Sequence, residues 1–148
     1  MSVCTFFGHR ECNGLREERL LSVIEGLIMQ GVTEFTVGNQ GQFDAMVCRC
    51  LRALQKTYPY IRYRVVLAYL PVGKTVADEH AETVYPEGME TVPPRFAIQR
   101  RNRYLVETAD VCLCYIDHTW GGAYGFVCMA RQRGLKVINL GTVELSEK

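Results

Sequence analysis

The clearest indication of the fold class is the stretch TEFTVGNQGQFDAMV, which runs from Thr33 to Val47. The first five residues form a short run that is typical of a buried strand. From Gln42 onward apolar residues recur at helical spacing as far as Lys56. Gly38 and Gly41 lie at the junction, where the chain must turn tightly. The stretch therefore predicts a strand, a glycine turn and a helix in direct succession.

The same alternation continues through most of the chain. Further strands are predicted over 3–7, 61–70, 110–116 and 136–140, and further helices between 13 and 31 and over 95–108 and 123–133. Strands that alternate with helices at this spacing build a parallel sheet with helices on both faces. We therefore predict one α/β domain over 1–148, a three-layer sandwich around a mainly parallel five-stranded sheet.

One segment, from Pro71 to Pro94, interrupts the alternation. It contains four prolines and the acidic residues Asp78, Glu79, Glu82, Glu87 and Glu90. Long loops without secondary structure are uncommon in compact domains and usually act as lids or are disordered. We expect a lid-like loop over about 71–94, with room for a short helix around 76–83.

Composition excludes several classes of protein. A formal net charge of +1 gives no general attraction to nucleic acid or to an anionic membrane. No stretch has the apolar length of a membrane span, and the first residues lack the features of a secretory signal. Seven cysteines without C-x-x-C pairs indicate free thiols in the reducing cytoplasm. A metal site from Cys4, His9 and Cys12 is conceivable but poorly spaced, so no metal is expected.

Three glycine-bearing turns follow predicted strands: Gly8-His9-Arg10, Gly38-Asn39-Gln40-Gly41 and Gly121-Gly122. Ligands of parallel sheets bind at the carboxyl ends of the strands, so these turns should meet at one edge. Backbone N–H groups at a helix start bind an anion without a lysine.

The side chains of these turns leave alternatives open. Arg10 can grip a phosphate with two parallel hydrogen bonds, or it can pair with Glu17 and leave His9 half-exposed. Asp44 can accept hydrogen bonds from ribose hydroxyls, or it can only cap its helix.

The helix over 95–108 also carries candidate ligand contacts. Arg101 and Asn102 share a side with apolar residues, and Arg95 lies near the helix start at the ligand edge. A cation on an inward face needs a partner. Arg100 and Arg103 are expected to lie in solvent. Beyond this helix, Trp120 or Tyr124 could stack on a base, whereas His80 and His118 have no partner pattern and receive no catalytic role.

Four motifs, in this order, resemble the SLOG superfamily and its YpsA-like branch: FFGHR, GNQGQFD, PPRFAIQRRNRYLVETADVCLCY and GGAYG. The similarity runs from about residue 4 to 140. It implies a Rossmann-like domain related to the LOG proteins and to DprA, which bind nucleotides or nucleotide-derived signals such as ADP-ribose-like molecules. It also implies a small-molecule nucleotide ligand, no further cofactor and a homodimer. Nucleic acid is disfavoured by the net charge.

The resemblance has one departure that bears on function. LOG enzymes cleave the N-glycosidic bond of nucleoside monophosphates with an arginine, matched here by Arg100 or Arg101, and a glutamate after a glycine-rich motif. No acid follows Gly121-Gly122 here. We therefore predict a nucleotide-binding sensor or sequestering domain first. The alternatives are a LOG-like N-glycosidase that uses Asp44 or Glu90 with Arg101, and an adaptor whose pocket is vestigial.

Overall fold

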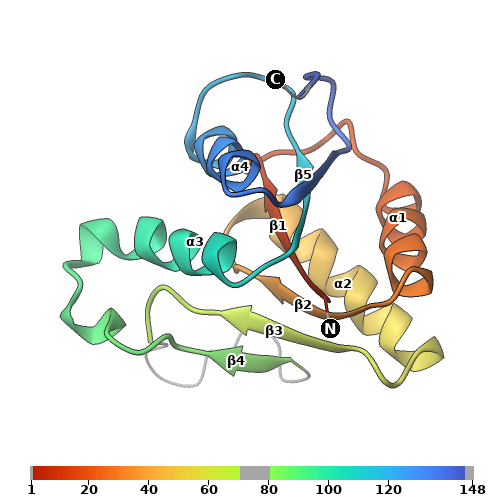
Figure 1. Ribbon diagram of the computed structural model, residues 1–148, viewed down its shortest axis with the longest axis horizontal. Helices are drawn as coiled ribbons and strands as arrows, with labels where there is room; N and C mark the ends of the chain where they lie inside the picture. Colours follow the sequence, from red (N-terminus) through yellow and green to blue (C-terminus); the bar gives the residue numbers. More distant parts are fainter. Residues whose placement is uncertain (1, 71–80, 146–148) are drawn as a thin grey trace.

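A computed structural model describes residues 2–70 and 81–145 and shows an α/β sandwich (Figure 1). Its strands are β1 (Ser2–Gly8), β2 (Val32–Val37), β3 (Arg62–Val66), β4 (Glu82–Val84), β5 (Val111–Tyr115) and β6 (Lys136–Asn139). Its helices are α1 (Glu17–Met29), α2 (Gly41–Thr57), α3 (Ala97–Glu107) and α4 (Gly122–Gln132), with 3-10 turns η1 (Met89–Thr91) and η2 (Pro94–Phe96). The predicted Rossmann-like architecture is confirmed.

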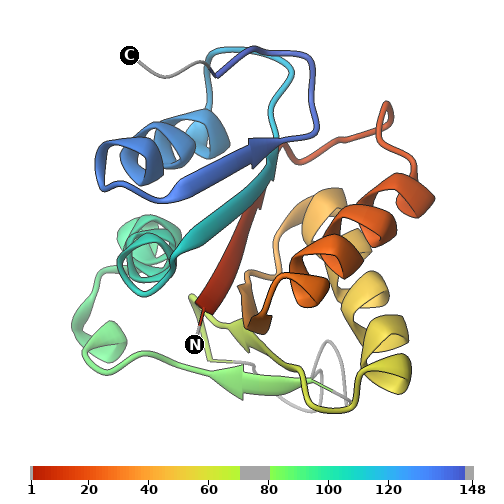
Figure 2. The ribbon, with the colours of Figure 1, turned by 45° about the vertical axis from the view of Figure 1, so that its right-hand side comes forward.

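The sheet separates two helical layers. Helices α1 and α2 cover one face, and α3 and α4 cover the other (Figures 1 and 2). Strand residues alternate between the two cores: Phe6 and Leu113 pack on the α1–α2 side, whereas Cys112 and Cys114 pack on the α3–α4 side. Cys112 and Cys114, two positions apart on β5, therefore share one buried face of the sheet.

The sheet has six strands rather than the predicted five, because a short strand forms inside the segment expected to be a lid. Strand β4 pairs in parallel with β3, with Glu82 opposite Arg64. It is an edge strand whose first two residues are exposed, so it has no apolar alternation in the sequence. Residues 71–80, with most of the helix expected over 76–83, lie outside the described residues.

The order of the strands determines where a ligand can bind. The order is β4-β3-β2-β1-β5-β6, and each neighbouring pair is parallel. The chain builds outward from β1 to β4 and then returns to place β5 on the other side of β1. Such a reversal opens a crevice at the carboxyl ends of the strands. The turns after β1, β2 and β5 therefore face a common space.

One side chain from β6 holds the end of β5 in place. The Asn139 carboxamide donates to the carbonyl oxygens of Ile116 (3.1 Å) and Val143 (2.6 Å). Its oxygen accepts the backbone N–H groups of Ile116 (2.8 Å) and Gly141 (2.9 Å). These bonds satisfy backbone N–H and C=O groups that lie just beyond the ends of β5 and β6. They also position the two residues that follow Ile116, which belong to the site described next.

No helix in the described part of the chain is long and apolar enough to cross a membrane.

Candidate functional site

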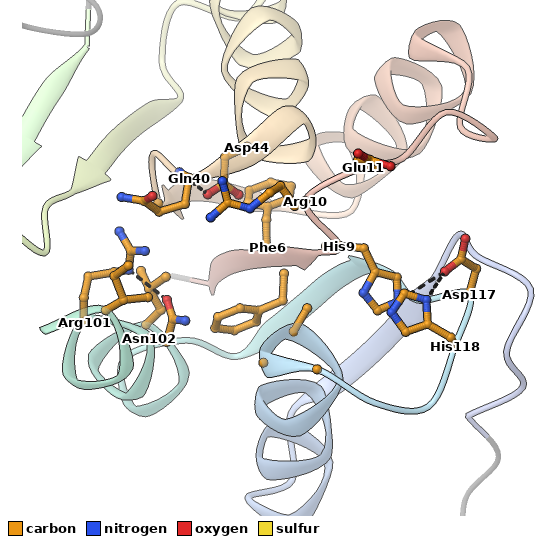
Figure 3. A pocket seen from close by; sticks show the side chains of 18 residues that line it. Phe6, His9, Arg10, Glu11, Gln40, Asp44, Arg101, Asn102, Asp117 and His118 are labelled. Atoms are coloured by element: carbon orange, nitrogen blue, oxygen red, sulfur yellow. Dashed lines mark hydrogen bonds and ion pairs between the residues drawn. The ribbon is translucent and has the colours of Figure 1, made fainter. Parts of the chain in front are cut away.

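A cavity of about 580 Å³ lies at the carboxyl edge of the sheet (Figure 3). The three glycine turns meet there as expected, together with one side of α3 and the loop after β5. The lining residues are Phe6, Phe7, Gly8, His9, Arg10, Glu11, Gly38, Gln40, Asp44, Ile98, Arg101, Asn102, Leu105, Asp117, His118, Gly121, Gly122 and Ala123.

Arg101 is the buried cation of this cavity, with 2% of its surface exposed. Its Nη1 donates to the carbonyl oxygen of Val66 (2.9 Å), and its Nε donates to Oδ1 of Asn102 (2.8 Å). Burial lowers the pKa of Arg101, and the nearby negative charge of Asp44 opposes that shift. The prediction that Arg101 points inward is confirmed. Arg100, the other arginine compatible with the family pattern, is exposed and does not line the cavity.

Gly38 allows the Arg101 guanidinium to lie against the backbone. A Cβ at this position would lie 2.9 Å from both Cζ and Nη1 of Arg101 and 3.0 Å from Oδ2 of Asp44. These separations are shorter than ordinary van der Waals contacts. Because Gly38 has no side chain, the Arg101 guanidinium and the Asp44 carboxylate can both lie against its backbone.

Asp44 both accepts a backbone N–H at the start of α2 and lines the cavity, and its contact with ribose hydroxyls stays a prediction. Its Oδ2 accepts the backbone N–H of Gln40 at 3.0 Å. Burial raises the pKa of Asp44 to about 6, against the opposing effects of the Gln40 N–H and of the Arg101 charge. The cavity therefore holds a carboxyl group that is partly protonated near neutral pH.

Replacing Asp44 by asparagine is expected to stabilise the protein at neutral and alkaline pH. Because the pKa is raised in the folded state, the stabilising contribution of the carboxyl group is present below its ordinary pKa of 3.8 and is lost as pH rises through about 6. Asp44→Asn keeps an oxygen for the Gln40 N–H and carries no charge. We expect its free energy of unfolding at about pH 8 to exceed that of the wild type by about 1–2 kcal/mol, discounted for partial solvent contact.

Urea unfolding at about pH 4, 6 and 8 measures this difference, which should shrink as the pH falls. Glu144→Gln, at an exposed carboxylate, is the control and should change little at any pH. An Asp44→Asn variant that is less stable than the wild type at about pH 8 would contradict the assignment.

His9, Asp117 and His118 form a second polar cluster at the other end of the cavity (Figure 3). The Nε2 of His9 lies 3.3 Å from Oδ1 of Asp117, and Nδ1 of His118 lies 2.7 Å from the same oxygen. The two imidazole rings stack with centroids 3.5 Å apart, and the Trp120 ring lies 4.0 Å from that of His118. The expectation that His118 lacks a partner is therefore wrong.

His9 is buried, with 8% of its surface exposed, rather than half-exposed. Burial lowers its pKa, as does the adjacent His118, whereas Asp117 and a backbone hydrogen bond with His118 raise it. Arg10 is exposed at the cavity, and the expected alternative partner, Glu17, instead pairs with Arg49 at 3.0 Å. Cys4 and Cys12, the other members of the conceivable metal site with His9, are buried and do not line the cavity.

Several residues expected at the site do not line the cavity. Asn39 lies beside it, where its Oδ1 is 3.5 Å from Nη1 of Arg101, and Gly41 begins α2. Arg95 places its guanidinium over the Phe96 ring at 4.7 Å. Tyr124 packs at the edge of the α3–α4 core, and Glu90 is exposed in η1.

Other residues line the cavity without having been expected there. Asp117 and His118 directly follow β5, so the rule that ligands meet strand ends could have identified them. The apolar residues that form one wall of the cavity could not be identified in this way, because apolar residues of a core and of a cavity wall look alike in sequence. This apolar wall consists of Phe6, Phe7, Ile98, Leu105 and Ala123.

The starts of two helices add positive potential to the cavity. Gln40, the residue before α2, and Gly121 to Ala123 at the start of α4 all line it. At α2 the Gln40 N–H is already used by Asp44. At α4 no side chain caps the first turn, and Gly121 has φ +96°, a conformation that favours glycine. The first N–H groups of α4 are therefore the ones best placed to receive an anion.

The chain matches no protein-family model and no curated protein.

Proposed function

We propose that this protein binds a nucleotide or a nucleotide-derived small molecule, such as a nucleoside phosphate or an ADP-ribose-like molecule, as a sensor or sequestering domain. The observation that carries the proposal is the buried Arg101 guanidinium, which faces the same cavity as the uncapped start of α4. A fixed cation and a helix start in one crevice favour an anionic ligand. Their position at the strand ends is the usual one for nucleotides in such sheets.

The remaining walls suit the other parts of a nucleotide. We place the phosphates between the Arg101 guanidinium and Gly121-Gly122, where the backbone is free of side chains and the first turn of α4 is uncapped. Asn102 and Asp44 offer amide and carboxyl groups for ribose hydroxyls. The apolar wall suits a base. Trp120, 68% exposed beside His118, can stack on the base from the rim.

A second candidate function is cleavage of an N-glycosidic bond in a nucleoside phosphate or NAD-type substrate. One observation favours it: the pKa of Asp44, raised to about 6, suits a group that exchanges a proton near neutral pH. Such a reaction passes through an oxocarbenium-like transition state that a carboxylate stabilises. The absence of an acid after Gly121-Gly122 keeps this function second to binding.

Purified protein mixed with AMP, ADP, NAD, ADP-ribose, ribose 5-phosphate and inorganic phosphate separates these functions. Thermal shift and calorimetry report binding, and chromatography of the recovered ligand reports cleavage. We expect stabilisation by members that carry both a base and a phosphate, with the ligand recovered intact. Released free base that is lost in Asp44→Asn would make the protein a glycosidase. No binding to any member would reject both functions and leave an adaptor with a vestigial pocket.

We also propose a cytoplasmic homodimer. Free thiols at all seven cysteines, five of them buried, suit a reducing compartment. The dimer follows from the family resemblance, and light scattering of the eluted protein would test it.

A further inference from the structure

We propose that His9, Asp117 and His118 bind a divalent transition-metal ion, Zn²⁺ or a cation of similar ligand preference, at the edge of the cavity. Two imidazoles and one carboxylate are donors that such ions accept. One donor atom from each residue lies within 4.8 Å of the others. The three residues come from the ends of β1 and β5, which are neighbours in the sheet.

One of the two donor separations at Asp117 fits a single ion, and the other is shorter. An ion that holds nitrogen and oxygen ligands at about 2.0–2.2 Å in a tetrahedron separates them by roughly 3.3–3.6 Å. The Nε2 of His9 and Oδ1 of Asp117 are 3.3 Å apart, and Nδ1 of His118 is 2.7 Å from the same oxygen. To bind one ion, the His118 ring must turn out of its stack on His9 and the Asp117 carboxylate must move away from it. Both side chains reach solvent, which leaves room for this movement.

An independent observation concerns the Nε2 atom of His9. This atom is buried and makes no hydrogen bond with any residue in the described parts of the chain, although it faces Asp117. A buried polar atom normally makes a hydrogen bond, whereas this one has the 3.3 Å contact with Asp117 without hydrogen-bond geometry, which favours a ligand between them. A metal ion satisfies the lone pair of a neutral imidazole directly. The His9 ring is 8% exposed and stacks on the His118 ring, so the atom lies inside the cluster.

At this position the ion could coordinate water or a ligand bound in the cavity. Because His9, Asp117 and His118 all line the cavity, an ion bound by them would lie at the edge of that space and would have open coordination positions. Water or an anionic oxygen of a ligand can occupy them. Metal binding itself does not rest on the proposed nucleotide function, and it can be tested without any nucleotide.

Calorimetric titration of the chelator-treated full chain with Zn²⁺ alone tests the proposal. We expect one equivalent to bind, and Asp117→Asn and His118→Ala each to weaken binding by at least about tenfold. Circular dichroism of the metal-free variants should match the wild type, because both side chains reach solvent. Binding well below one equivalent, or binding that neither substitution weakens, would overturn the proposal.

Cysteine thiolates could bind Zn²⁺ instead of this cluster, because the chain has seven cysteines. Two controls therefore test whether a thiolate holds the ion. Cys48 and Cys128 are the two that are not fully buried. The double variant Cys48→Ser/Cys128→Ser should bind Zn²⁺ as the wild type does. Co²⁺ in place of Zn²⁺ should give a spectrum without a thiolate charge-transfer band. Loss of binding in the serine variant, or a thiolate band, would assign the metal to cysteine and reject this site.

Discussion

Arg101→Gln will weaken binding of a phosphate-bearing nucleotide by about 1.5–3 kcal/mol, roughly ten- to a hundredfold in Kd. The substitution removes the buried cation of the cavity but keeps an amide that can donate to the carbonyl of Val66. A charge-assisted hydrogen bond in a partly desolvated site is among the strongest contacts available to an anion. The loss should therefore exceed that of any exposed arginine.

Calorimetry with the best ligand of the nucleotide panel measures the effect. Arg103→Gln is the matched control, because Arg103 lies on the same helix, is exposed and does not line the cavity. It should bind as the wild type does. Unchanged affinity in folded Arg101→Gln, or an equal loss in both variants, would show that Arg101 does not contact the ligand.

Gly38→Ala will destabilise the protein by about 1–3 kcal/mol and reduce ligand binding with it. The new Cβ would lie 2.9 Å from the Arg101 guanidinium, which is held in place by Val66 and Asn102 and cannot move without losing those hydrogen bonds. The same Cβ would press on Asp44 at 3.0 Å. Because the φ angle of Gly38 is not in the left-handed region, the cost comes from this crowding and not from the backbone.

Gly26→Ala is the matched control for this substitution. Gly26 lies within α1, and a Cβ there would meet no atom within 4 Å. Alanine in an unhindered helical position should stabilise the protein by about 0.5–1 kcal/mol. Urea unfolding of both variants gives the comparison. Equal or greater stability in Gly38→Ala would mean that the close approach of Arg101 to this backbone does not constrain the fold.

The spacing of apolar residues along the chain was enough to predict most of the strands and helices. The apolar pattern of α2 and the β-branched and aromatic residues of β3 have strong local signals, and both elements form where they were expected. Strand β3 ends at Val66 rather than Leu70, because pairing with its neighbours stops there. Strand β4 was missed since its exposed edge carries no apolar pattern, and only its pairing with β3 defines it.

Part of the site could also be predicted from local sequence patterns. Gly38, Arg101 and the start of α4 could be located from glycine turns at strand ends and from the apolar side of a helix. Arg95 and Tyr124 share those neighbourhoods but face elsewhere. A difference of one or two positions along a helix turns a side chain away from a cavity. Secondary-structure propensities do not show which direction a side chain takes.

The amino-acid sequence alone predicts the alternation of strands and helices and the glycines at the carboxyl ends of strands, because both follow from local sterics and from the spacing of apolar residues. Which strand ends become neighbours depends on the packing of the whole domain. This packing placed β5 beside β1, which stacks His9 on His118 against Asp117, and it buried Arg101 over Gly38. These contacts join residues far apart in the chain. They depend on strand order and packing, which no local pattern encodes.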